Sequence, residues 1–146
     1  MRALIQRVSS GSVTIEDEVV GKINEGLVIL LGINHDDNEA DAKYLADKCV
    51  NLRIFCDEND KMNRSLLDIE GEALIISQFT LYGDARKGRR PSFTDAARPV
   101  HAIPLYEKFI EYVKNSNIKV ATGEFGASML VDIQNNGPVT LMLESQ

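Results

Sequence analysis

The sequence is poor in cysteine and in long apolar runs. These two shortages argue against a disulfide-bonded secreted protein and against a membrane protein. Cys49 and Cys56 are its two cysteines, with no second pair and no signal peptide beside them, so we predict reduced thiols in a cytoplasmic protein. The apolar patch at the N-terminus is too short for a secretory signal. No apolar run approaches the length needed to span a bilayer, so we predict no membrane partner.

Positive charge is also scarce. Lysine and arginine number 16 against 22 aspartates and glutamates, which gives a net charge of −6. This balance argues against indiscriminate binding to nucleic acid, and we predict no DNA partner. Contact with any polyanion would need a local basic patch. One patch exists in ARKGRRPSF, residues 85–93, and its basic residues are Arg86, Lys87, Arg89 and Arg90. It is either a contact for phosphate groups or a solvated, mobile loop.

Apolar material is plentiful, and its spacing predicts strands at both ends of the chain. The 146 residues are 44% hydrophobic and 26% charged, which fits a single domain spanning residues 1–146 that needs neither metal nor disulfide. Residues 2–15 and 18–33 hold short apolar or alternating runs. Leu27 to Ile33 is apolar apart from Gly32, which predicts a strand buried on both faces.

Two segments have helical spacing. Residues 35–52 form the first, and either Asp36 or Asp37 suits its N-cap. Residues 103–117 form the second, and Pro104 suits its first turn. Further strands are expected at 53–57, 73–84 and 118–145. The apolar stripes of the two helices are Ala42, Leu45, Cys49 and Leu52, and then Leu105, Phe109, Ile110 and Val113.

This arrangement of elements predicts the fold class. Strands gather at both ends of the chain and do not alternate regularly with helices, so a regular βαβ fold is not expected. We predict an α+β fold. It is a single compact domain whose mostly antiparallel or mixed β-sheets form a barrel-like core, with two main helices.

Conventional catalytic groups are few. The two histidines are His35, in a strand-to-helix turn, and His101, just before a helix. There is no G-x-S-x-G elbow for a hydrolytic serine. The acidic residues of 36–41 are explained by helix capping, and those of 57–60 by a solvated loop, because neither group has the spacing of a known cation loop. We therefore predict no metal and no cofactor.

Two polar strings beside apolar strands remain. SQFT covers residues 77–80, directly after the apolar run 73–76, and NNGPVT covers residues 135–140. Asn-Gly is a strong signal for a tight turn, yet here it is followed at once by Pro138. Taken separately, Thr80 and Thr140 are ordinary β-branched strand residues.

Together the strings resemble a known family. ISQFTLYGD at 76–84 and NNGPVT at 135–140 are similar to the two signature strings of the D-aminoacyl-tRNA deacylases, and RALIQRVSSGSV and KGRRPSF resemble that family too. The similarity extends from Met1 to about Glu144. It implies hydrolysis of the ester that joins a D-amino acid, or glycine, to the 3′-terminal ribose of tRNA. It also implies a homodimer with active sites at the subunit interface.

The resemblance implies a role for the second string. It places substrate binding at Gly137, Pro138, Val139 and Thr140, and gives Arg7 the role of supporting this loop. The Gly137–Pro138 bond is expected to be cis, and the loop to reach into the partner subunit's site. Main-chain carbonyls there would contact the substrate's α-ammonium and reject L-amino acids by leaving no room for an L side chain. Glycine has no side chain and would not be excluded.

The first string then supplies the chemistry. Catalysis is assigned to Ser77, Gln78, Phe79 and Thr80, with the backbone N–H groups around Phe79 and Thr80 binding the ester carbonyl and its developing negative charge. We expect water to be the attacking group, assisted by the tRNA 2′-OH. The basic residues of 86–90 would bind tRNA.

Two alternatives stay open. A conventional hydrolase would use Thr80 or Ser77 as nucleophile with His35 or His101 as base. A non-catalytic RNA-binding module would use the patch at 85–93, although the sequence lacks the stacking aromatics of RNP motifs.

Overall fold

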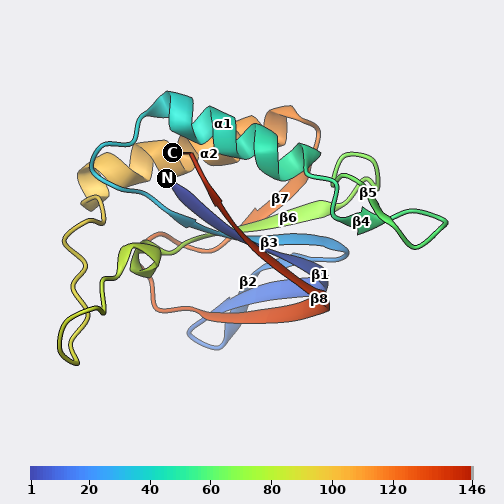
Figure 1. Cartoon of the computed structure of the whole chain (residues 1–146). Coiled ribbons are helices and arrows are strands. Elements are labelled where there is room, and N and C mark those ends of the chain that lie inside the picture. Colours follow the sequence, from blue (N-terminus) through green and yellow to red (C-terminus); the bar gives the residue numbers. More distant parts are fainter. Residues whose placement is uncertain (146) are drawn as a thin grey trace.

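The structure is a computed structural model that describes residues 1–145, and its strands form one mixed sheet and a small two-stranded sheet. The main sheet has six strands in the order β2-β1-β3-β6-β7, with β8 paired to β1 outside this path. Because β2 also lies against β7, the sheet curls into a nearly closed barrel, as predicted (Figure 1). The strands are β1 (Arg2–Ile15), β2 (Glu18–Ile23), β3 (Gly26–Gly32), β4 (Phe55–Cys56), β5 (Met62–Arg64), β6 (Glu72–Ser77), β7 (Lys119–Thr122) and β8 (Leu130–Glu144).

The long strand β1 connects most of the sheet. Its first half, Arg2–Val8, pairs antiparallel with β3, and its second half, Gly11–Ile15, pairs antiparallel with β2. On its other side β8 accompanies it antiparallel from Arg2 to Thr14. Because β3 and β8 both pair with β1, segments that leave either strand are positioned by their register with β1.

Two helices cover one face of the sheet and pack against each other (Figure 1). Helix α1 (Glu39–Asn51) lies in sequence between β3 and β6, and helix α2 (Pro99–Asn115) lies between β6 and β7. Each helix is part of a crossover, so β3, β6 and β7 run parallel to one another. The mixed sheet and the two helices confirm the predicted fold class. Within residues 1–145, neither helix is long and apolar enough to cross a membrane.

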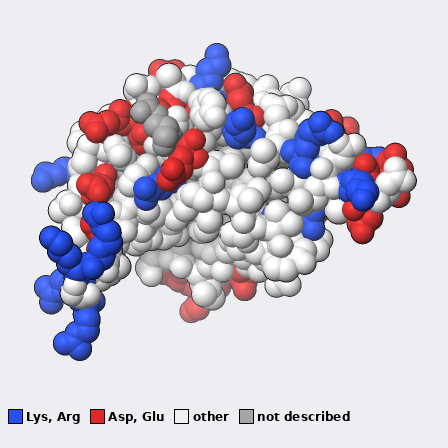
Figure 2. All heavy atoms as spheres, in the orientation of Figure 1, with Lys and Arg blue, Asp and Glu red and all other residues white. Residues whose placement is uncertain are grey.

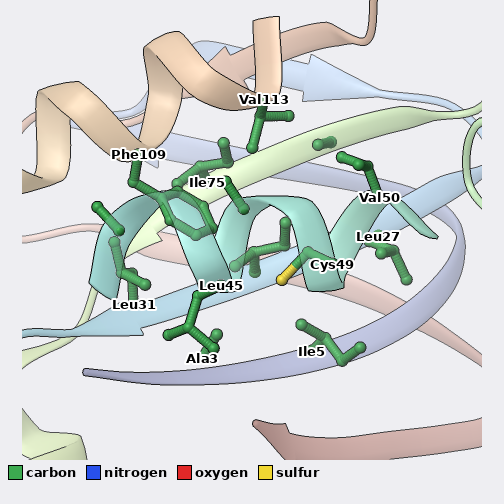
Figure 3. Close-up of a cluster of buried hydrophobic side chains, with 14 of the residues drawn as sticks. Ala3, Ile5, Leu27, Leu31, Leu45, Cys49, Val50, Ile75, Phe109 and Val113 are labelled. Atoms are coloured by element: carbon green, nitrogen blue, oxygen red, sulfur yellow. The ribbon is translucent and has the colours of Figure 1, made fainter. Parts of the chain in front are cut away.

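The main core lies between the helices and the sheet (Figure 3). Alternate residues of β3 face either this core or a second apolar cluster on the opposite face, so the strand is buried on both sides as its sequence predicts. Both cysteines are free thiols, and burial of Cys49 in the main core raises its pKa to about 12. The labelled core residues are Ala3, Ile5, Leu27, Leu31, Leu45, Cys49, Val50, Ile75, Phe109 and Val113.

Both predicted helix starts were wrong. Helix α1 is capped by Asn38, whose side chain accepts hydrogen bonds from the N–H groups of Ala40 and Asp41, while Asn38 N donates to Asp41 Oδ2 at 2.9 Å. Asp37 cannot serve as the cap because its carboxylate binds elsewhere. Helix α2 begins at Pro99, which takes the favourable first position, so Pro104 lies inside the helix.

Candidate active site

The SQFT string leaves the sheet at the end of β6 and becomes a short turn. Gln78 N still donates to Leu31 O of β3 at 2.8 Å, and the chain then folds into the 3-10 turn η1 (Phe79–Tyr82). Leu81 N donates to Gln78 O at 3.2 Å, and at the other end of the turn Gly83 N donates to Thr80 O at 2.9 Å. The N–H groups of Phe79 and Thr80 precede this ladder, so they are at the open end of the turn.

The side chains of the string do not form a nucleophile–base pair. Gln78 Nε2 donates to the Thr80 hydroxyl, which is exposed. His35 Nε2 donates to Thr94 O at 2.6 Å, and His101 Nε2 donates to Asp37 O at 2.9 Å. Within residues 1–145, no hydrogen bond joins either imidazole to Thr80 or Ser77, so the geometry gives no support to a histidine-activated hydroxyl.

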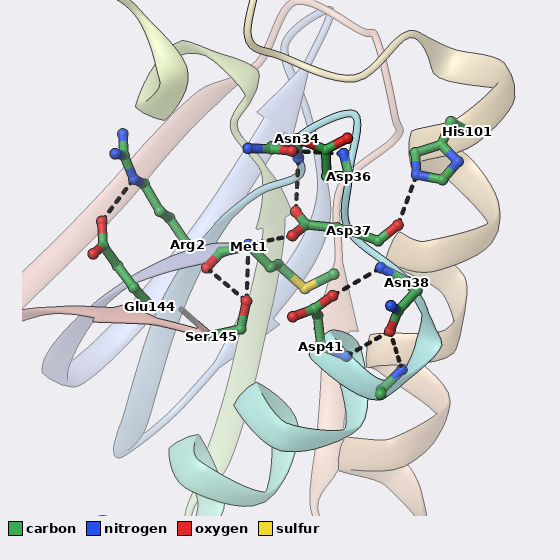
Figure 4. A network of polar contacts seen from close by, with 11 residues as sticks. Met1, Arg2, Asn34, Asp36, Asp37, Asn38, Asp41, His101, Glu144 and Ser145 are labelled. Atoms are coloured by element: carbon green, nitrogen blue, oxygen red, sulfur yellow. Dashed lines mark hydrogen bonds and ion pairs between the residues drawn. The ribbon is translucent and has the colours of Figure 1, made fainter.

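Arg2 holds the turn in place, although it was not among the predicted site residues. Its Nε donates to Glu144 Oε1 at 2.8 Å (Figure 4). Its Nη1 donates to Leu81 O at 2.9 Å, and its guanidinium lies 4.5 Å from the ring centre of Tyr82. Tyr82 is buried, and its burial raises the pKa of the phenol. A basic residue at the start of a strand gives no sign in the sequence that it will reach a turn so far along the chain.

A polar network behind the turn joins three separate segments (Figure 4). The Met1 ammonium lies 2.6 Å from Asp37 Oδ1 and 2.9 Å from Ser145 Oγ. The other oxygen of Asp37 accepts from Asn34 N at 2.7 Å. The start of β1, the end of β8 and the turn before α1 are thereby joined, and Arg2, next to Met1, connects them to Leu81 of η1.

NNGPVT lies inside β8, which pairs with β1 on both sides of the string. Gln6 pairs with Thr140 and Val8 with Asn135, which leaves residues 136–139 bulging out opposite Arg7. We call residues 136–139 the Gly-Pro loop. Its Gly137–Pro138 bond is cis, as expected, and both residues are exposed.

Arg7 clamps this loop. Its Nε donates to Asn136 O at 3.1 Å and its Nη1 to Ile54 O at 2.8 Å. Gly137 has φ +124°, and a Cβ there would lie 2.7 Å from Arg7 Nη2. Only glycine therefore allows the loop to adopt this conformation against the guanidinium.

The ends of the loop are fixed by the side chains that flank it. Asn135 Oδ1 accepts from Val139 N at 3.2 Å, and Asn135 Nδ2 donates to Thr140 Oγ1 at 2.8 Å. Gln6 Nε2 also donates to the Thr140 hydroxyl, at 3.3 Å. Val139 is half-buried against the main core. In this chain Val139 and Thr140 anchor the loop, and the main chain around Gly137 is what it presents outward.

A single chain does not bring the two strings together. The turn η1 is contacted by Arg2 and the Gly-Pro loop lies opposite Arg7, two residues that are about 16 Å apart along β1 at roughly 3.3 Å per residue. The cavities beside them have different linings. One of about 400 Å³ includes Arg2, Tyr82 and Gly83, and another of about 320 Å³ includes Arg7 and Asn136. The SQFT and NNGPVT strings therefore lie beside two different cavities of the chain.

The basic patch is an exposed loop that projects from the body of the protein (Figure 2). Arg86 is neutralised within it, because its Nε and Nη2 donate to the two carboxylate oxygens of Asp84 at 2.9 and 2.7 Å. This pairing lowers the pKa of Asp84 to about 2. Among the described residues, no ion pair engages Lys87, Arg89 or Arg90. These three are therefore the cations available to a phosphate chain.

Known proteins resemble this chain in both sequence and fold. The family model described as D-Tyr-tRNA(Tyr) deacylase matches residues 4–144. A D-aminoacyl-tRNA deacylase from Thermosipho africanus is 62% identical over 146 residues, which is 100% of this chain and 98% of that protein. Among solved structures, the c-Myc DNA unwinding element binding protein is 39% identical with a TM-score of 0.93, covering 100% of this chain and 99% of that one. A protein described as a probable eukaryotic D-amino acid tRNA deacylase is 19% identical and has the same fold, with a TM-score of 0.86 and 98% of each chain covered.

Proposed function

The chain belongs to the D-aminoacyl-tRNA deacylase family, hydrolases that act on the ester bond of D-aminoacyl-tRNA, and from this we propose that two copies of the chain build each active site. One copy contributes the open end of η1, and the other contributes the Gly-Pro loop. The observation that carries this proposal is the separation of the two strings within one chain, where Phe79 and Thr80 are exposed at one place and the Gly-Pro loop is exposed at another. Cytoplasm, where charged tRNA is used, is the proposed location.

The proposed chemistry relies on main-chain atoms. The N–H groups of Phe79 and Thr80 bind the ester carbonyl oxygen and its developing negative charge, which is the largest electrostatic contribution in acyl transfer. Carbonyls of the partner's Gly-Pro loop accept from the α-ammonium and leave no room for an L side chain. Water attacks the ester carbon with help from the tRNA 2′-OH, and the ester oxygen leaves on the ribose. Glycine on tRNA-Ala is accepted because it has no side chain to exclude.

The direct experiment compares three substrates. Purified protein is assayed at catalytic concentration on D-tyrosyl-tRNA, L-tyrosyl-tRNA and glycyl-tRNA-Ala. We expect rapid release from the first and the third and little from the second. Equal rates on the D and L esters would contradict selection by the Gly-Pro loop. Stoichiometric binding without turnover would instead favour the RNA-binding module.

Subunit exchange tests whether the site is shared. Thr80→Pro removes one of the two proposed N–H donors, and Gly137→Ala disturbs the loop, so each variant alone should lose most of its activity. A mixed dimer has one site with both halves intact. An equal mixture of the two should therefore recover up to roughly a quarter of wild-type activity. No recovery, in a mixture shown to exchange subunits, would place both strings in the site of one chain.

Thr80→Ala is expected to retain most of the hydrolysis rate, because the proposal uses the N–H group of Thr80 and not its hydroxyl. His35→Ala and His101→Ala should also stay active. A nucleophile or general base commonly supplies ~10²–10⁴-fold. A loss of that size in Thr80→Ala, measured by single-turnover hydrolysis on protein with an unchanged Tm, would favour the conventional hydrolase.

The salt dependence of tRNA binding should report the free cations of the loop. Replacing Lys87, Arg89 or Arg90 by alanine should each lower the slope of log K against log salt by about 0.7–0.9 for every phosphate that the side chain neutralises. Arg86→Ala is the matched control, because its charge is already paired with Asp84. Slopes that match the wild type in all four variants would mean that the loop is only a solvated surface.

A further inference from the structure

Two exposed phenylalanines meet at the base of the basic loop. Phe79 lies on η1 and Phe93 follows the loop, and their ring centres are 5.3 Å apart with the rings at 70°. Phe79 is 54% exposed and Phe93 is 39% exposed. An edge-to-face pair of this kind is a favourable aromatic contact, and it leaves ring surface in contact with water.

The backbone fixes the position of Phe93. Asp84 N donates to Ser92 O at 2.7 Å and Ser92 N donates to Asp84 O at 2.9 Å, which closes the loop at its base. The next residue is thereby brought back beside Gly83. A Cβ at position 83 would lie 2.9 Å from Phe93 Cε1, so glycine is what lets the ring pack this closely.

The surroundings of the pair indicate what it binds. Large exposed apolar surfaces are unusual unless they serve a partner. Phe79 is the first residue of η1, and Phe93 closes the exposed stretch that carries Lys87, Arg89 and Arg90, three cations without an ion pair among the described residues. Aromatic rings beside a cationic track are the way proteins hold single-stranded nucleic acid, since every base has a face that can stack.

We propose that Phe93, supported edge-to-face by Phe79, stacks with an unpaired base of the RNA 3′ end on the 5′ side of the nucleotide that carries the ester. This rests on the proposed function, because the ester must lie at the open end of η1 for the direction to be defined. The strand then runs from η1 over the ring toward the loop, where its phosphates meet the cations. The contact is independent of sequence and adds affinity for RNA without touching the reacting atoms.

Substrates of two lengths distinguish base stacking by Phe93 from hydrolysis of the ester. Phe93→Ala should lower kcat/KM on a D-aminoacyl trinucleotide by about tenfold, mainly through KM, since alanine substitution of a stacking ring removes roughly 1–3 kcal/mol per base. On D-aminoacyl-adenosine, which has no upstream base, the same variant should match the wild type. Phe93→Trp should keep kcat/KM on the trinucleotide substrate near the wild-type value. Tyr44→Ala is the matched control, an aromatic residue 49% exposed on α1.

Binding can be followed without hydrolysis. The probe is a trinucleotide with the fluorescent base 2-aminopurine at its middle position. Its fluorescence should be quenched by wild-type protein and by Phe93→Trp, and much less by Phe93→Ala. If the wild type quenches the probe yet does not hydrolyse D-aminoacyl-adenosine, the proposed function fails and the stacking site stands. Equal loss by Phe93→Ala on both substrates, or unchanged activity and quenching, would overturn the stacking site. Dissociation of the dimer by Phe93→Ala would overturn it too, because the ring would then be covered by a second copy of the chain.

Discussion

Gly137→Ala is expected to lose most hydrolysis of D-aminoacyl-tRNA and to discriminate less sharply against the L ester. The new Cβ would lie 2.7 Å from Arg7 Nη2 and 3.0 Å from Val139 Cγ2, at a residue whose φ is +124°. Both the contact and the backbone angle force the loop to move. Residues held in such backbone regions cost of order 1–3 kcal/mol, which alone corresponds to roughly 5–150-fold in the population of the functional loop.

A matched glycine makes this result specific. Gly126 also has a positive φ, of +81°, but a Cβ there would meet nothing within 4 Å. Gly126→Ala should therefore show the effect of backbone strain alone and leave the ratio of kcat/KM for D- and L-tyrosyl-tRNA unchanged. Should Gly137→Ala keep the wild-type rate and ratio on folded protein, the loop would not be the element that selects chirality.

The elements that could be predicted from sequence are those governed by local patterns. The unbroken apolar run of β3 identified a strand buried on both faces, and the helical stripes gave two helices of about the right extent. The helix starts were missed because several residues compete for them. Asp37 is as good a cap as Asn38 by residue type, but the Met1 ammonium binds its carboxylate. That contact joins residues 36 positions apart and leaves no local signal.

The candidate site was predictable where a string of residues carries it and not where distant residues support it. The NNGPVT string marked the Gly-Pro loop, but not that β8 continues through it as a bulge because β1 pairs with the strand on both sides. Arg2 and Phe93 could not be found from their neighbours in sequence. Their positions depend on Leu81 O and on the pairing of Asp84 with Ser92, which exist only once the chain is folded.

Arg7→Ala is expected to reduce kcat/KM for D-aminoacyl-tRNA about as strongly as Gly137→Ala, without unfolding the protein. The guanidinium joins Asn136 O of the Gly-Pro loop to Ile54 O near β4, and hydrogen bonds from charged groups are worth about 1.5–3 kcal/mol each. Removing both frees the middle of the loop while Asn135 still holds its ends. A displacement of about 1 Å in a positioning element can lower a rate ~10²-fold.

The chemistry of arginine decides how the variants should rank. Lysine is a single flexible point charge without the rigid fork of a guanidinium, so Arg7→Lys can serve one carbonyl at a time and should fall between the wild type and Arg7→Ala. Arg53 is the matched control, since its Nε donates to Asn63 O at 2.9 Å outside the loop. The measurement is kcat/KM for D- and L-tyrosyl-tRNA, with Tm as the check on folding. If Arg7→Ala behaves like Arg53→Ala, the contacts of Asn135 are enough to hold the loop, and the clamp has no part in selecting the D-amino acid.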